Sequence, residues 1–199
     1  MDTVQKFREL VTHRSEQNRK SVEILHAQGL HENVMAILRQ EIDSFVRVIY
    51  VLSCYDYDYA TKLLDDCLEG RRWTKENSKI LTDREMVDRT ALTSGGWEGV
   101  AYKFGCSFIH LSNLCDLRNV DIEKVLTSIE RANIADYINQ YHFYDKEIKF
   151  PTSFTIDDIA HIAPAIFIKI HDNIKRSLGE LDNHFDELLE IKRIDEEDV

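Results

Sequence analysis

Hydrophobic residues recur every three or four positions along most of the chain, which is the spacing of helices that bury one face. The clearest run is "HENVMAILRQEIDSFVRVIYVLS", residues 31–53. The residues expected to point inward from it are Val34, Ile37, Leu38, Ile42, Phe45, Ile49 and Leu52. A first helix over 2–28 has the same spacing, with Val4, Phe7, Leu10, Val11, Val22 and Leu25 inward.

Capping residues set the expected helix boundaries. Gly29 should end the first helix, and a third helix should follow Asp56 and end at Gly70. Thr82 with Glu85 forms a capping box that opens a fourth helix, which ends at 94–96. The remaining expected helices are 97–116, one from Thr127 or Ser128 to His142, and a long one from Thr155 to Arg193, kinked or restarted at Pro164.

The scarcity of chain-breaking residues supports an all-α fold. Only 7 glycines and 2 prolines occur in 199 residues, which argues against a sheet protein with many tight turns. We therefore predict a helical bundle of about six to seven helices with a long C-terminal helix. Residues 1–193 should form a single domain, and residues 194–199 an acidic tail.

Negative charge is concentrated at the C-terminal end. Nine acidic residues lie between 180 and 199 against Lys192 and Arg193, giving −7 of the total −11 and leaving −4 for the rest. This distribution argues against a large nonspecific DNA-binding face, although a local basic site could lie elsewhere.

Cysteine usage and hydropathy indicate the compartment. The four cysteines show no Cys-x-x-Cys spacing, and the start "MDTVQKFREL" contains no apolar signal segment. No apolar run is long enough to span a membrane, so we expect a cytoplasmic protein. We expect no metal or other cofactor, because Cys115 faces away from the pair formed by Cys106 and His110.

The stretch "YKFGCSFIHLS", residues 102–112, combines a polar stripe with two apolar faces. On a helix over 97–116, Lys103, Ser107 and His110 share a narrow stripe beside the main apolar face. Tyr102 and Ile109 point another way and form a second apolar patch. A second patch predicts contact with another subunit, so we expect a homodimer.

Placed after "AILRQEIDSFVRVIYVLS", the stretch "YKFGCSFIHLSN" resembles the HEPN superfamily (higher eukaryotes and prokaryotes nucleotide-binding domains). Those proteins are small, usually dimeric helical bundles, and many are metal-independent ribonucleases. Their motif is an arginine followed after four to six residues by a histidine. Lys103 and His110 match this spacing with six intervening residues, but lysine stands where the family has arginine.

The resemblance implies a ribonuclease of a defence or toxin–antitoxin system. His110 would move the proton of a ribose 2′-hydroxyl or of the leaving oxygen. Lys103 would offset charge on the scissile phosphate, while Ser107 and Asn113 would orient the imidazole or the phosphate. Alternatively, Lys103 extends to solvent and His110 makes a structural hydrogen bond within the bundle.

Two further sets of residues have alternative interpretations. Arg71, Arg72, Trp73 and Lys75 in "GRRWTKENSK" could bind RNA, or they could belong to a solvated loop anchored by its tryptophan. Arg39, Glu41 and Asp43 could match charged residues of HEPN proteins or form an ion pair that fixes helix packing. The alternative function is accordingly a noncatalytic helical-bundle protein that acts through a partner protein. The lysine at position 103 favours this noncatalytic alternative, since an ammonium cannot bind a phosphate through two parallel hydrogen bonds as a guanidinium can.

Overall fold

The computed structural model describes residues 2–94 and 121–197. These residues form seven helices and no strand, which confirms the all-α prediction. The helices are α1 (Thr3–Ala27), α2 (His31–Leu52), α3 (Tyr57–Leu68), α4 (Asp83–Ser94), α6 (Ile122–Val125), α7 (Ser128–His142) and α8 (Ile156–Glu197). The expected helix over 97–116 lies outside the described residues.

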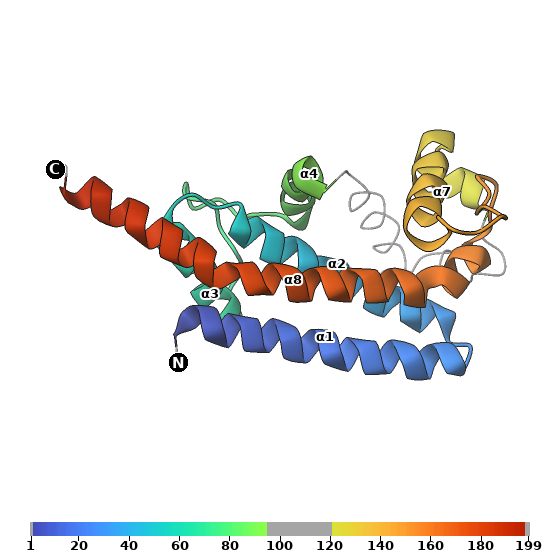
Figure 1. Ribbon diagram of the computed structural model, residues 1–199, viewed down its shortest axis with the longest axis horizontal. Coiled ribbons are helices and arrows are strands. Elements are labelled where there is room, and N and C mark those ends of the chain that lie inside the picture. Colours follow the sequence, from blue (N-terminus) through green and yellow to red (C-terminus); the bar gives the residue numbers. More distant parts are fainter. Residues whose placement is uncertain (1, 95–120, 198–199) are drawn as a thin grey trace.

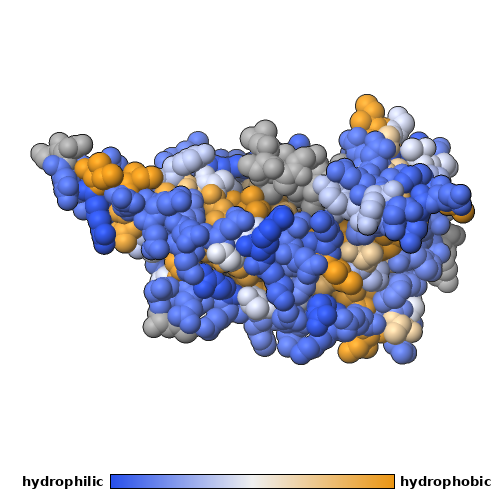
Figure 2. Space-filling view, viewed as in Figure 1, coloured by the Kyte–Doolittle hydropathy of each residue, from blue (hydrophilic) through white to orange (hydrophobic). Residues whose placement is uncertain are grey.

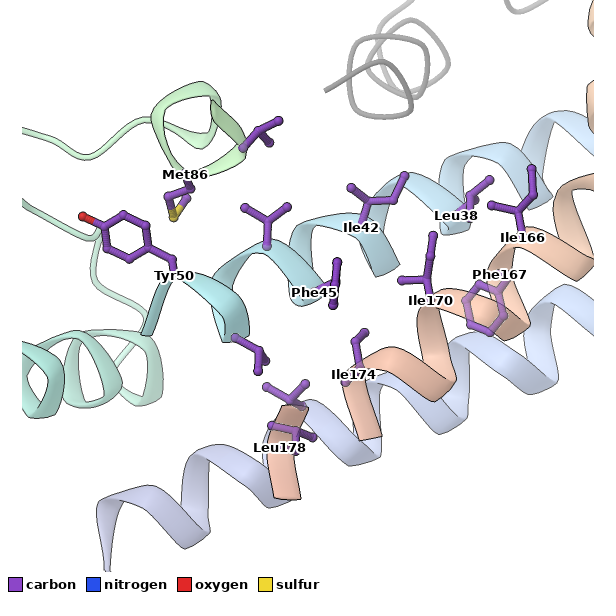
Figure 3. Close-up of a cluster of buried hydrophobic side chains, with 14 of the residues drawn as sticks. Leu38, Ile42, Phe45, Tyr50, Met86, Ile166, Phe167, Ile170, Ile174 and Leu178 are labelled. Carbon is purple, nitrogen blue, oxygen red and sulfur yellow. The ribbon is translucent and has the colours of Figure 1, made fainter. Parts of the chain in front are cut away.

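Three long helices make up the body of the bundle. α1, α2 and α8 contact one another and run side by side, while α3 packs on α1 and α8 and α4 packs on α2 (Figure 1). The core between α2 and α8 is mostly apolar, and Leu38, Ile42 and Phe45 of α2 are buried in the same cluster as side chains of α8 (Figure 3). The labelled α8 residues of this cluster are Ile166, Phe167, Ile170, Ile174 and Leu178. The C-terminal end of α8 projects past the other helices (Figure 1).

Most helix boundaries follow the predicted capping chemistry. The Asp56 carboxylate accepts the Tyr59 amide at 2.6 Å and begins α3. The capping box of Thr82 and Glu85 is present, with the Thr82 amide donating to Glu85 at 3.0 Å and the Glu85 amide donating to Thr82 at 3.3 Å. Thr127 begins α7 with a second capping box. The ends of α1 and α3 are followed by Gly29 and Gly70, each with a φ of 70°.

α8 corrects the expected C-terminal end and excludes one of the two outcomes expected at Pro164. The helix continues through Pro164 without restarting and ends at Glu197, beyond the expected end at Arg193. The described part of the predicted acidic tail is therefore helical. Pro164 removes one backbone donor at a cost of about 3 kcal/mol. Buried side chains on both sides of it, including Ala160 and Phe167, hold the helix together by packing.

α2 is the central helix and is buried on more than one face. Its predicted inward residues are all buried or partly buried, whereas Leu10 of α1, also predicted inward, is 45% exposed. α2 contacts α1, α4 and α8, so it also buries Met35, Val46, Val48 and Val51 on its other sides. Because it has little exposed surface, α2 buries polar side chains as well, and these shape the candidate site.

Cys54, next to the end of α2, is a free and buried thiol. Burial raises its pKa to about 12, so the thiol is protonated and unreactive at neutral pH. This state agrees with the expectation that the cysteines act as small hydrophobic residues. Cys106 and Cys115 lie outside the described residues.

Candidate functional site

The four residues that the HEPN resemblance makes catalytic are Lys103, Ser107, His110 and Asn113. All four lie within 95–120, outside the described residues. The spatial relation between the lysine and the histidine therefore stays a prediction. The described helices do show how the chain enters this segment, because α4 ends immediately before it.

Ion pairs hold the start of α4 against α2. The Asp83 carboxylate lies 3.1 Å from Arg47 Nη2 and 3.8 Å from Arg39 Nη2. Asp43 lies 3.9 Å from Arg39 and 3.3 Å from Arg47. Arg39 and Asp43 thus form the packing ion pair that the sequence allowed. Glu41, on the same helix, lies elsewhere.

The predicted RNA-binding stretch lies in the loop between α3 and α4. Arg71 Nε lies 2.7 Å from Asp66 and the guanidinium also pairs with Glu69, while Lys75 pairs with Glu85. The bond from Lys75, together with those from Thr82, lowers the pKa of Glu85 to about 2. Arg72 is exposed. Two of the three cations are therefore engaged by carboxylates of the chain itself.

Trp73 is the anchor of this loop. It is only 3% exposed, with the Tyr50 ring 6.2 Å away and the Arg47 guanidinium 5.0 Å above its own ring. The Leu81 amide donates to the Trp73 carbonyl at 2.9 Å and closes the loop. A buried indole offers no face on which a base could stack, so this geometry matches the anchored-loop interpretation.

A polar cluster at the centre of the bundle joins three helices. Ser15 of α1 donates to the Glu41 carboxylate of α2, and its Oγ lies 2.7 Å from His171 Nδ1 of α8. The Ser15 hydroxyl therefore lies between a carboxylate and an imidazole, and each of these groups can form a hydrogen bond with it. Asn18 Nδ2 donates to the second Glu41 oxygen at 2.9 Å.

Charged side chains surround the outer side of His171. Its Nε2 lies 3.5 Å from Glu16, and the Lys175 ammonium lies 3.8 Å from the same carboxylate. Partial burial alone would raise the pKa of Glu16, but His171, Arg19 and Lys175 outweigh it and lower that pKa. The imidazole thus bridges the buried cluster and the surface.

The cluster has the residue types of a hydrolytic site but not the access. Ser15 is 1% exposed and Glu41 is 0% exposed, and His171 is also buried. A nucleophile must reach the reacting atom of a substrate, and this hydroxyl is enclosed by its own partners. The arrangement can align three helices through directional hydrogen bonds, which is a structural role.

Sequence reasoning missed this cluster, although a signal for part of it was present. Ser15 and Asn18 continue the spacing of Phe7, Val11 and Val22, so two polar residues occupy positions on an apolar stripe. Such positions predict a buried hydrogen-bond network rather than a solvated face. The spacing did not identify His171 as a partner of Ser15, because the two residues are 156 positions apart in the sequence.

Three histidines meet at the other end of α1. The His31 ring lies 5.3 Å from that of His26 and 4.8 Å from that of His161, between ring centroids. His161 Nδ1 lies 2.8 Å from the Asp157 carbonyl. In the part of the chain that the structure describes, no group of three or more His, Cys, Asp or Glu side chains is arranged to hold a metal ion. The ring contacts of His31 with His26 and His161 join the turn between α1 and α2 to α8.

A surface groove lies between the start of α3 and the end of α8. Its sides are formed by Tyr55, Asp56, Tyr57, Leu188, Ile191, Lys192, Asp195 and Glu196. Figure 2 shows hydrophobic surface on this projecting end of α8, surrounded by hydrophilic surface. Among the described residues, no helix is long and apolar enough to cross a membrane.

Comparison with known proteins found no matching family model, no similar curated protein and no similar solved structure.

Proposed function

We propose that this protein is a noncatalytic helical-bundle protein that acts by binding a partner protein. The supporting observation is the contrast between its interior and its projecting end. The described cluster that has the residue types of a hydrolytic site, Ser15, Glu41 and His171, is buried and internally hydrogen-bonded. Apolar side chains are instead exposed where α8 leaves the bundle.

Three of the exposed apolar residues of the described chain lie near the groove between α3 and α8, while others are spread over the rest of the surface. Tyr55 is 86% exposed, and Ile191 and Ile194 are about half exposed on the last turns of α8. Exposed apolar surface that adjoins a groove and is rimmed by polar residues is typical of protein interaction sites. Single exposed hydrophobic residues need no such explanation, but a cluster on a projecting helix favours a binding role.

The test is isolation of the chain at its natural level from the cells that produce it. We expect a defined complex in which a second protein is present in a fixed ratio to the chain. Adding the purified partner back should raise the melting temperature of the chain, because a ligand that binds only the folded state stabilises it. A chain recovered alone, with no second protein in a fixed ratio, would contradict the proposal.

The second candidate function is a HEPN-like, metal-independent ribonuclease of a defence or toxin–antitoxin system. It is favoured by the spacing of Lys103 and His110, with six residues between them. It is also favoured by the ion pairs of Asp83, which hold the helix before that segment against the bundle. In this candidate the protein is a homodimer through Tyr102 and Ile109, and Ser107 and Asn113 orient the reacting groups.

Cleavage of varied single-stranded RNAs decides between the two functions. If the second candidate holds, His110→Ala should abolish cleavage and leave the free energy of unfolding within about 1 kcal/mol of wild type. Lys103→Arg should preserve or raise activity, because guanidinium binds phosphate bidentately. The proposed noncatalytic function predicts that wild type cleaves none of these RNAs, so cleavage that requires His110 would overturn it.

A further inference from the structure

The groove between α3 and α8 has a fixed apolar floor. Leu188 is buried at its base, and the ring of Tyr57 meets that of Phe185 edge-on at 6.0 Å between centroids. Tyr55 and Ile191 also line the groove, and their side chains are exposed to solvent. The buried residues hold the shape of the groove, and the open ones provide surface for a ligand.

Lys192 fastens the two sides of the groove together. Its ammonium lies 2.6 and 2.8 Å from the two Asp58 oxygens and 5.6 Å from the centroid of the Tyr57 ring. The hydrogen bond to Asp58 raises the pKa of Lys192, despite partial desolvation, so its charge persists at neutral pH. The end of α8 is thereby attached to the start of α3 before any ligand arrives, which lowers the ordering cost of binding.

The rim of the groove is acidic. Asp56, Asp58, Asp195 and Glu196 contribute four negative charges against the single positive charge of Lys192, which leaves −3. Asp58 is paired with that lysine, so Asp56, Asp195 and Glu196 provide the unbalanced charge. A ligand that fits must therefore be apolar on one side and positively charged at its edges.

We propose that this groove binds a basic amphipathic helix of a partner protein. The proposal rests on the noncatalytic binding function and names the surface and the class of partner. From Leu188 to Glu196 the groove follows about two helical turns, or roughly 12 Å at 1.5 Å per residue. A helix with apolar residues at i, i+3 or i+4, and i+7 matches this length, with lysine or arginine at its flanks.

Charge argues against the two other occupants of an exposed apolar surface. A second copy of this chain docked symmetrically would bring another strongly acidic end, with −7 over residues 180–199, against the same rim. An anionic lipid surface would be repelled in the same way. A basic helix is attracted, and the attraction should weaken with salt because the rim carboxylates are exposed.

The test measures binding of a labelled peptide to the full chain by fluorescence anisotropy at low and physiological salt. The probe is a helical peptide of about 16 residues with leucines on one face and lysine and arginine at its flanks. The matched control has the same leucines with glutamate in place of every basic residue. We expect saturable binding of the basic peptide only, weaker at physiological salt.

Variants locate the binding. Ile191→Glu and the pair Asp195→Lys with Glu196→Lys should each weaken binding by about tenfold or more. Two controls should stay within about threefold of wild type, as expected of residues outside a binding site. They are Ile168→Glu, at an equally exposed isoleucine of α8, and the pair Asp172→Lys with Glu180→Lys, which changes the net charge equally.

The outcomes separate this inference from the proposed function. Equal losses in the groove and control variants would mean general attraction to an acidic chain and would overturn the groove assignment, as would absence of binding. If a stable natural complex is isolated but its formation is unaffected by Ile191→Glu, the binding function stands and the groove proposal fails. If no complex is isolated, the binding function itself fails.

Discussion

Replacing Glu41 with alanine should lower the free energy of unfolding by about 3–5 kcal/mol, because it leaves a cavity and removes the shared acceptor of a buried hydrogen-bond network. The carboxylate is 0% exposed and accepts hydrogen bonds from Ser15 and Asn18. Without it, the Ser15 hydroxyl loses its acceptor and Asn18 loses a partner. Urea unfolding followed by far-ultraviolet circular dichroism measures the change.

The matched control is Glu41→Gln, which preserves the shape and one acceptor oxygen of the side chain. We expect it to cost less than Glu41→Ala, because the cavity is avoided and one hydrogen bond can remain. If Glu41→Ala lowers the free energy of unfolding by less than about 1 kcal/mol, the cluster contributes little to holding the helices together.

Replacing Trp73 with alanine should also cost about 3–5 kcal/mol of unfolding free energy, as for a large aromatic residue removed from a core. The indole is buried against Tyr50 and beneath Arg47, so its loss leaves a cavity where the α3–α4 loop meets α2. Thermal and urea unfolding measure the effect. The structural role predicts that stability, rather than RNA affinity, is lost.

Two companion variants refine this expectation. Trp73→Phe should cost clearly less than Trp73→Ala, because it preserves an aromatic ring and removes an Nε1 that has no hydrogen-bond partner among the described residues. Tyr144→Ala, at a 74% exposed aromatic residue, should change stability by no more than about 0.5 kcal/mol. An unchanged stability in Trp73→Ala would contradict the role of the tryptophan as a loop anchor.

Local chemistry accounts for the parts of the fold that could be read from the sequence. Thr82 with Glu85, Asp56 and the two glycines after α1 and α3 act within a few residues, so their effects can be seen in a short stretch. The inward position predicted for Leu10 was wrong, and α8 ends four residues later than predicted. The exposure of Leu10 and the continuation of α8 through Pro164 depend on which neighbouring helices cover each face, and local spacing does not specify that.

The candidate sites also depend on contacts between residues that are far apart in the sequence. The anchoring role of Trp73 was one of two interpretations of a basic loop, and the burial of the indole beside Tyr50 favours this interpretation. Glu41 was recognised as a charged residue of α2, but its partners Ser15 and His171 come from helices far apart in the chain. The groove of α3 and α8 combines residues near 55 with residues near 192, and only the fold brings them together.

Site-specific photo-crosslinking in the cells that produce this protein tests the binding function most directly. A photoreactive amino acid at position 191 would report contacts of the groove, and the same amino acid at position 168 would report an equally exposed position elsewhere on α8. We predict one discrete crosslinked protein from position 191 and none from position 168. No crosslinked product from position 191, or the same products from both positions, would contradict a partner-binding role for the projecting end of α8.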